Sequence, residues 1–171
     1  MNSAVVHIIS DVGFSGKALY YSGPFVNIGP IPPKVEQTTT YTIVWTLSNT
    51  ANNISKALVK STIPPWINFV GSISPVGEDI TYNTFTKEIT WNIGKIPKGS
   101  GITGSARSVA FQISFKPSLS QVNTIPYLLN DAILTGYDDF ANVDVIVRKT
   151  KLNTNLNNDT AFPSDGSAVA E

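Results

Sequence analysis

The sequence predicts an all-β protein, built from two packed antiparallel sheets with seven to nine strands in total. Several segments alternate apolar and polar residues with a period of two, which places one face of each strand on a core. Clusters of glycine, proline and asparagine separate these segments at a spacing typical of sandwiches, and helix-period patterns are nearly absent. We therefore expect a β-sandwich without long helices.

The clearest predicted strand runs from Tyr41 to Leu47. Apolar side chains occupy every second position there and threonines face water, although Val44 interrupts the alternation. The next segment, 57–63, is rich in β-branched residues and ends at Pro64-Pro65, because proline lacks the N–H that a strand interior needs. A further strand is expected at 67–73.

A hairpin is predicted in the middle of the chain. Its strands are a short one at 80–82 and a longer one at 88–93, which carries Ile89, Trp91 and Ile93 on one face. Four glycines and one proline between residues 94 and 104 indicate a loop. The remaining strands are expected at 108–115, 131–137 and 143–148.

The composition excludes several classes of function. The 171 residues hold 12 basic and 12 acidic side chains, and no cluster of lysine and arginine, so nucleic-acid binding is not expected. The absence of cysteine excludes disulfides and thiol nucleophiles. No apolar run approaches the ~20 residues of a membrane helix, so no membrane insertion is expected. Residues 1–10 do not read as a secretory signal, so such a signal would have been removed or would lie outside this sequence.

Three motifs occur in an order that resembles a known family. They are Tyr41-Thr-Ile-Val-Trp-Thr-Leu-Ser-Asn-Thr50, Ala57-Leu-Val-Lys-Ser-Thr-Ile-Pro-Pro65 and Ile89-Thr-Trp-Asn-Ile-Gly94. This order is similar to the immunoglobulin-like repeats of bacterial and archaeal cell-surface proteins, a family described as a domain of unknown function. The resemblance implies an immunoglobulin-like sandwich that is extracellular and non-catalytic, and that spaces or presents other domains.

The chain is expected to divide into three parts. Residues 1–30 form an N-terminal linker or first strand, residues 31–151 form the sandwich, and residues 152–171 form a linker-like tail. The run of asparagines between residues 153 and 158 favours a polar tail.

The two ends of the sequence resemble each other. Asp11 and Phe14 near the start align with Asp159 and Phe162 near the end at the same separation. If this similarity reflects a repeat, the tail is either the start of a next repeat or a strand that pairs with the sheet edge of a neighbouring copy. Leu156, Asp159 and Phe162 are then the predicted assembly segment. The alternative is a disordered polar tail.

No residue pattern predicts catalysis. The only histidine, His7, has no recognisable nucleophile motif, and the glycine-rich loop lacks the Lys-Ser/Thr ending of a phosphate-binding loop. Asp138 and Asp139, with Asp131 and Asp144 nearby, form the best group of oxygen ligands, but their spacing fits no known calcium loop. We expect neither a metal nor another cofactor, and no enzymatic activity.

Three aromatic residues form a predicted contact patch. Trp45 and Trp91 fall on inward faces and are expected in the core. Trp66 instead follows the double proline at a position where the family usually has glycine. It either caps the end of the sandwich or forms a contact patch with Tyr20 and Tyr21.

Three functions follow from these observations. The first is a structural module of a repetitive surface protein of a bacterium or archaeon, whose partners are neighbouring copies or adjacent domains. The second is a self-assembling filament or surface-layer subunit, joined by strand exchange of a terminal segment. The third is an adhesin that binds a glycan or a protein through the Trp66 end.

Overall fold

The protein is an all-β sandwich, as the sequence predicts. The computed structural model describes residues 8–171, so His7 lies outside the described residues. The strands are β1 (Val12–Leu19), β2 (Thr39–Asn49), β3 (Ile54–Thr62), β4 (Ile67–Ser74), β5 (Asp79–Asn83), β6 (Glu88–Ile96), β7 (Arg107–Phe115), β8 (Tyr127–Leu129), β9 (Ala132–Asp138), β10 (Val143–Lys149) and β11 (Leu152–Asn153). A single turn of 3-10 helix covers Leu119–Gln121. Within residues 8–171, no helix is long and apolar enough to cross a membrane.

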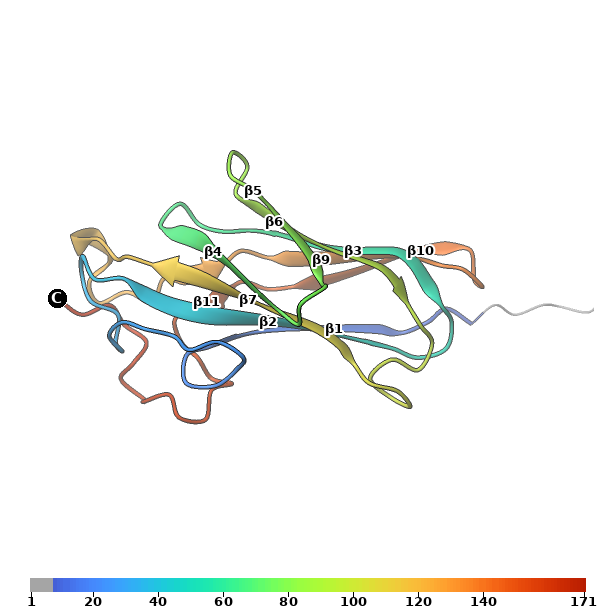
Figure 1. The fold of residues 1–171 in the computed structure, drawn as a ribbon, viewed down its shortest axis with the longest axis horizontal. Helices are drawn as coiled ribbons and strands as arrows, with labels where there is room; N and C mark the ends of the chain where they lie inside the picture. Colours follow the sequence, from blue (N-terminus) through green and yellow to red (C-terminus); the bar gives the residue numbers. More distant parts are fainter. Residues whose placement is uncertain (1–7) are drawn as a thin grey trace, which may run out of the picture.

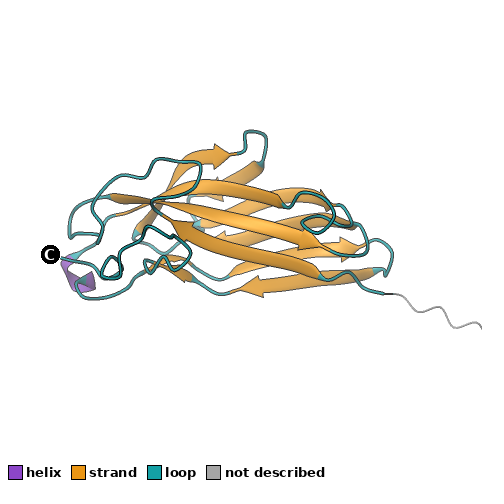
Figure 2. Ribbon diagram, turned by 90° about the horizontal axis from the view of Figure 1, so that it is seen from below, coloured by secondary structure: helices purple, strands orange, loops and turns teal. Residues whose placement is uncertain are grey.

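Two sheets make up the sandwich (Figures 1 and 2). The four-stranded sheet has the order β1-β2-β7-β4, and the five-stranded sheet has the order β10-β9-β3-β6-β5. These nine strands match the predicted number, and β8 pairs with β11 in a separate small ribbon. If the β5–β6 hairpin and the ribbon are set aside, the remaining strands have the ABED and GFC order of a constant-type immunoglobulin domain. The immunoglobulin-like class is thereby confirmed by strand order.

Aromatic side chains fill the space between the sheets. Trp45 on β2 and Trp91 on β6 are fully buried, and their rings stack across the sandwich with centroids 6.5 Å apart. Phe111 on β7 meets Trp45 edge to face at 4.9 Å. Such ring pairs add ~1 kcal/mol each beyond the area they bury. The inward positions of both tryptophans are as predicted.

The predicted exposure of the threonine face of β2 is wrong at one end. Thr42 is buried because the connection between β1 and β2 covers this face of the sheet. The Asn27 side-chain amide donates to the Thr42 hydroxyl at 3.0 Å, and the Thr40 N–H donates to the Ile28 carbonyl at 2.8 Å. Gly29 has a positive φ of 98°, and an added Cβ would collide with the Thr38 carbonyl oxygen. The sequence pattern shows β2 but not the loop that lies on it.

The last twenty residues pack on their own sandwich. Residues 152–171 were expected as a linker-like tail, yet Leu156 and Val169 are buried in the core cluster. Thr154 is also buried, and its hydroxyl donates to the Ser167 carbonyl at 2.6 Å. The segment that aligns with β1 forms turns, with the Phe162 N–H donating to the Asp159 carbonyl. In this structure the two similar sequences therefore differ in conformation.

A carboxylate connects the two sheets at the β4–β5 connection. Glu78 receives two hydrogen bonds from the Arg107 guanidinium, at 3.2 and 3.1 Å, and one from the Trp91 indole N–H at 2.7 Å. Arg107 lies on β7 and Trp91 on β6, so this carboxylate holds together one strand from each sheet. The Arg107 side chain also donates to the Ile93 carbonyl at 2.9 Å.

Loss of the Glu78 charge should destabilise the fold. Glu78→Gln removes a charged acceptor from a partly buried pair and leaves donors unpaired, so the free energy of unfolding should fall by about 1–3 kcal/mol. Chemical denaturation measures this difference. The matched control is Glu36→Gln, since the ion pair of Glu36 with Lys116 at 2.8 Å is exposed and should contribute below about 1 kcal/mol. Equal effects of the two substitutions would contradict the role assigned to Glu78.

Candidate functional site

The three residues of the predicted contact patch do not come together. The Tyr20 and Tyr21 rings meet edge to face at 4.8 Å, at the end of β1. Trp66 lies before β4, and β1 and β4 are the two opposite edges of the four-stranded sheet. Tyr20 is tied inward, because its ring meets Tyr41 at 6.1 Å and its hydroxyl donates to the Gly29 carbonyl at 2.5 Å.

Trp66 has other neighbours than the sequence indicated. Its indole N–H donates to the Tyr127 carbonyl at 2.9 Å, and Trp66 and Tyr127 remain 38% and 43% exposed. The Lys151 ammonium lies 4.6 Å from the centre of the Tyr127 ring. Trp66, Tyr127 and Lys151 come from distant parts of the sequence, so no local pattern could have grouped them. The indole is thus bonded to the β8 backbone and remains partly exposed.

The predicted assembly segment is anchored by a buried aspartate. Asp159 is 4% exposed and accepts backbone N–H bonds from Tyr20 and Tyr21, both at 2.7 Å. Burial alone would raise the pKa of Asp159, but these bonds and that of the Ser22 hydroxyl lower it below its usual value. Leu156 is buried and Phe162 is half-buried against the core. The structure therefore places all three residues of this segment on the chain's own sandwich.

Beyond Asp159, the chain ends in a narrow slot. Val169 and Ala170 lie between two segments, 33–35 and 122–124, and form parallel bridges with Lys34 and Val122. We call this arrangement the terminal slot. It lies at the end of the sandwich where β2 begins, and the Asp159 anchor is at the same end. No sequence signal marks it, because its two walls come from loops.

The opposite end of the sandwich is tied by a second aspartate. Asp138 is fully buried, and its carboxylate accepts from the Ser10 N–H at 2.8 Å, the Asn52 side chain at 3.0 Å, and the N–H groups of Phe140 and Ala141. Burial alone would raise its pKa, but these hydrogen bonds lower the pKa to about 2. In sequence Asp138 belongs to the best group of oxygen ligands, whereas in the structure its oxygens accept N–H donors from three segments of the chain.

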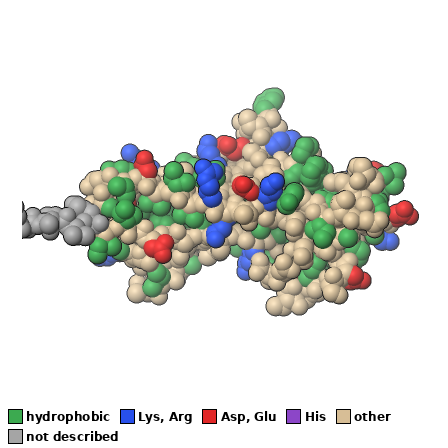
Figure 3. All heavy atoms as spheres, turned by 180° about the vertical axis from the view of Figure 1, so that it is seen from behind, with side chains coloured by type: hydrophobic (Ala, Val, Ile, Leu, Met, Phe, Trp, Pro, Cys, Tyr) green, Lys and Arg blue, Asp and Glu red, His purple; other side chains and the backbone are tan. Residues whose placement is uncertain are grey.

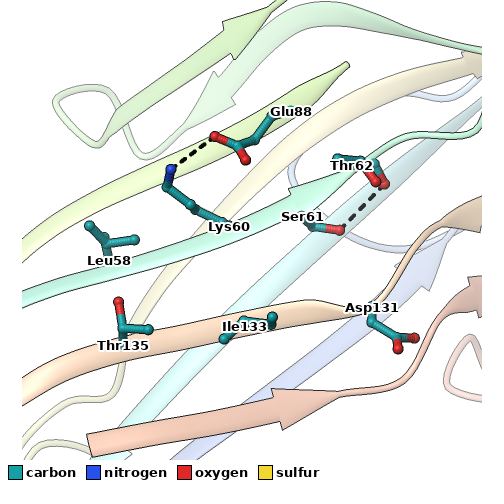
Figure 4. A pocket seen from close by; sticks show the side chains of 8 residues that line it. All are labelled: Leu58, Lys60, Ser61, Thr62, Glu88, Asp131, Ile133 and Thr135. Atoms are coloured by element: carbon teal, nitrogen blue, oxygen red, sulfur yellow. Dashed lines mark hydrogen bonds and ion pairs between the residues drawn. The ribbon is translucent and has the colours of Figure 1, made fainter. Parts of the chain in front are cut away.

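A shallow hollow lies on the outer face of the five-stranded sheet (Figure 4). It has a volume of about 480 Å³, with Leu58 on β3 and Ile133 on β9 among its aliphatic lining. Lys60 and Glu88 form an ion pair across it at 3.0 Å. The Ser61 hydroxyl donates to the Asn130 carbonyl at 2.9 Å, so it is engaged with backbone. This arrangement offers a weak apolar contact and no paired nucleophile and base.

Charged side chains of both signs occur together on the surface. Figure 3 shows basic and acidic side chains interspersed on one face of the molecule, without a large area of a single sign. The same balance holds in composition, with 12 basic and 12 acidic residues. A mixed surface does not steer a polyanion toward the protein.

Comparisons with known proteins concern the fold. No family model matches the chain, and no curated protein matches it. Among solved structures, the full-length major pilin SpaD from Corynebacterium diphtheriae superposes with a TM-score of 0.51 at 13% identity, over 84% of this chain and 34% of the pilin. The major pilin subunit BcpA of Bacillus cereus gives a TM-score of 0.45 at 12% identity, over 84% of this chain and 40% of that one. The RrgA Jo.In complex gives a TM-score of 0.45 at 8% identity, over 67% of this chain and 76% of that one.

This chain spans 34% to 40% of the length of the two pilins. At 13% identity, the likeness to SpaD shows a shared fold, and the two scores of 0.45 carry no further weight. The likeness is therefore one of fold, to part of a bacterial major pilin.

The lowered pKa of Asp138 predicts a pH-dependent stability. The carboxylate stabilises the fold above the unfolded-state pKa near 4, and this contribution is lost as the pH falls toward the folded-state pKa of about 2. Asp138→Asn should therefore lower the free energy of unfolding by about 1–2 kcal/mol at pH 7, and the deficit should shrink between pH 4 and pH 2. Denaturation curves across this range measure it. Asp144→Asn, at an exposed position, is the control, and a pH-independent deficit in Asp138→Asn would be the contrary result.

Asp159 should protect specific backbone amides. Asp159→Asn removes a charged acceptor from Tyr20 and Tyr21, and such bonds contribute about 1.5–3 kcal/mol. Hydrogen exchange at these two amides should therefore accelerate by on the order of tenfold or more. Amides in the centre of β7, such as that of Phe111, should keep their rates. A uniform acceleration throughout the sandwich would show that Asp159 has no local role.

Proposed function

We propose that this chain is a non-catalytic structural module of a repetitive extracellular surface protein from a bacterium or archaeon. Its role is to space or present neighbouring domains, and its partners are adjacent domains or further copies. The observation that carries the proposal is the path of the chain. The described chain enters at one end of an elongated sandwich and leaves at the other (Figure 1).

Both ends of that path are anchored. At the first end, the Ser10 N–H donates to Asp138, and the Ser10 hydroxyl and the Asn52 backbone exchange hydrogen bonds. At the other end, the Ala170 N–H donates to the Pro33 carbonyl at 2.8 Å. The 11-residue β2 runs between these ends, which at ~3.3 Å per residue separates them by about 35 Å. Modules connected through such ends would add nearly their full length to a string.

The strand arrangement suits a load along this axis. β1 pairs with β2 over eight antiparallel residue pairs, and antiparallel hydrogen bonds lie perpendicular to the strands. A pull on the first end therefore loads the whole β1–β2 ladder at once. The likeness in fold to part of the major pilin SpaD supports the same proposal.

Force spectroscopy tests the spacer function by comparing two pulling directions. Attachment at Ser10 and Ala170 should require a higher unfolding force than attachment at Phe85 and Ala170. Phe85 lies at the tip of the β5–β6 hairpin, at the edge of the five-stranded sheet, where bonds open one after another. Equal forces in the two directions would contradict a load-bearing role along the chain axis.

A second candidate is a self-assembling subunit in which copies exchange a terminal segment. The terminal slot favours it, because a short piece of chain is held there by backbone bonds that any copy of the same sequence could make. Light scattering of the full chain over a range of concentrations distinguishes this candidate from a monomeric spacer. A constant monomer mass would leave only the first candidate.

A further inference from the structure

The terminal slot satisfies both sides of a short extended segment. The Val169 N–H donates to the Thr124 carbonyl at 3.0 Å, and the Asn123 N–H donates to the Val169 carbonyl at 2.9 Å. The Ala170 N–H donates to the Pro33 carbonyl at 2.8 Å, and the Val35 N–H donates to the Ala170 carbonyl at 3.0 Å. Two successive residues therefore have all their backbone donors and acceptors paired, one residue to each wall.

The side chain between the walls adds selectivity. Val169 is 1% exposed and belongs to the core cluster, whereas the next two residues become progressively more exposed. In strand-addition sites, backbone bonds provide affinity and buried side chains provide specificity. The slot is thus a site for an extended apolar peptide with valine at one defined position.

Each wall also has hydrogen bonds that do not involve the segment it binds. The first wall is fixed to the sandwich because the Glu36 N–H donates to the Pro117 carbonyl at 2.9 Å and Pro33 is buried. In the second wall, the N–H and the hydroxyl of Thr124 both donate to the Gln121 carbonyl, at 3.0 and 2.6 Å. A site with walls that are already ordered loses little conformational entropy on binding.

The connection that leads into the slot lies on the surface. After the Asp159 anchor, residues Thr160, Ala161, Ser164 and Asp165 are exposed. A turn closes where the Gly166 N–H donates to the Pro163 carbonyl at 3.0 Å. The connection also touches the sandwich, because Phe162 is half-buried against the core and the Ser167 carbonyl accepts from the Thr154 hydroxyl at 2.6 Å. An exchanged segment would make these same contacts on the second copy, and none of the paired strands of the two sheets lies between Asp159 and Val169.

We propose that the terminal slot is a peptide-binding site whose partner is the 161–171 segment of a second copy of this chain. The inference rests on the second candidate function, self-assembly, and names its partner and its contacts. The contacts in the exchanged and unexchanged forms are identical, so the balance depends on the connection and on local concentration. Two copies held close together on a surface meet that condition.

The geometry is compatible with reciprocal exchange between two copies. The slot and the segment that fills it lie at the same end of the sandwich, and the chain enters at the far end. Two copies that exchange segments therefore meet end to end and satisfy each other, which closes a symmetric dimer.

The first experiment tests the site in the full-length protein. Val169→Asp places a charge in the slot and expels the chain's own segment, and Val169→Ser is the milder alternative if the fold is lost. A fluorescent peptide with the sequence of residues 161–171 should bind this variant in a 1:1 ratio. It should bind the unsubstituted chain at least tenfold more weakly, because that slot is filled. The same peptide with Val169→Asp should not bind.

The second experiment tests whether two copies exchange the segment. Deletion of Ser164 and Asp165 removes the turn, so the segment can no longer fold back into its own slot. Light scattering should show a dimer, and Val169→Asp in the same background should return it to a monomer. If the deletion variant remains a dimer after Val169→Asp is added, the slot is not the contact, although self-assembly still holds. If the deletion variant is a folded monomer, the exchange of segments is wrong. Failure of the labelled peptide to bind a folded Val169 variant overturns the site itself.

Discussion

The structure depends on the stacked pair of Trp45 and Trp91. One ring comes from each sheet, so the stack sets the separation of the sheets and the register in which their inner faces meet. Phe111 packs edge to face on the same ring of Trp45, and Glu78 accepts the indole N–H of Trp91. The centre of the sandwich is therefore both apolar and oriented by one charged group. The sequence has no cysteine, so packing between the sheets, and no disulfide, holds them together here.

Two buried aspartates accept backbone N–H groups at opposite ends of the sandwich. Asp138 collects N–H donors from the first described residues, from the β2–β3 turn and from the β9–β10 turn. Asp159 collects the N–H groups that follow β1 and holds the final segment beside them. In each case one buried carboxylate replaces the backbone pairing that a strand end loses. The sandwich is consequently held by a buried carboxylate at each of its two ends.

Much of the sandwich could be predicted from sequence, because strand patterns are local. The period-two alternation of Tyr41–Leu47 and of Glu88–Ile93 gives the correct strands and the correct inward tryptophans. The loop that buries Thr42 could not be predicted, since its contacts are with residues far along the chain.

The packing of residues 152–171 was also not predictable from a local pattern. Its buried residues, Leu156 and Val169, are separated by asparagine, serine and proline, so no period exists to reveal them. Asp159 reads as a solvated residue in an asparagine-rich run, yet it is buried by partners at Tyr20 and Tyr21. Trp66 stands out in the sequence because it follows the double proline. Its hydrogen-bond partner Tyr127 lies in no recognisable motif. The function is harder to predict from the sequence than the fold, because this fold serves many functions.

The sandwich holds Asp11 and Glu171 at its opposite ends, far apart. Because the sequence has no cysteine, spin labels can be placed on Asp11→Cys and Glu171→Cys alone. Pulsed electron spin resonance of the full chain should give one narrow distance distribution, centred at or beyond the ~35 Å spanned by β2. A broad distribution, or a dominant distance well below this value, would contradict the account.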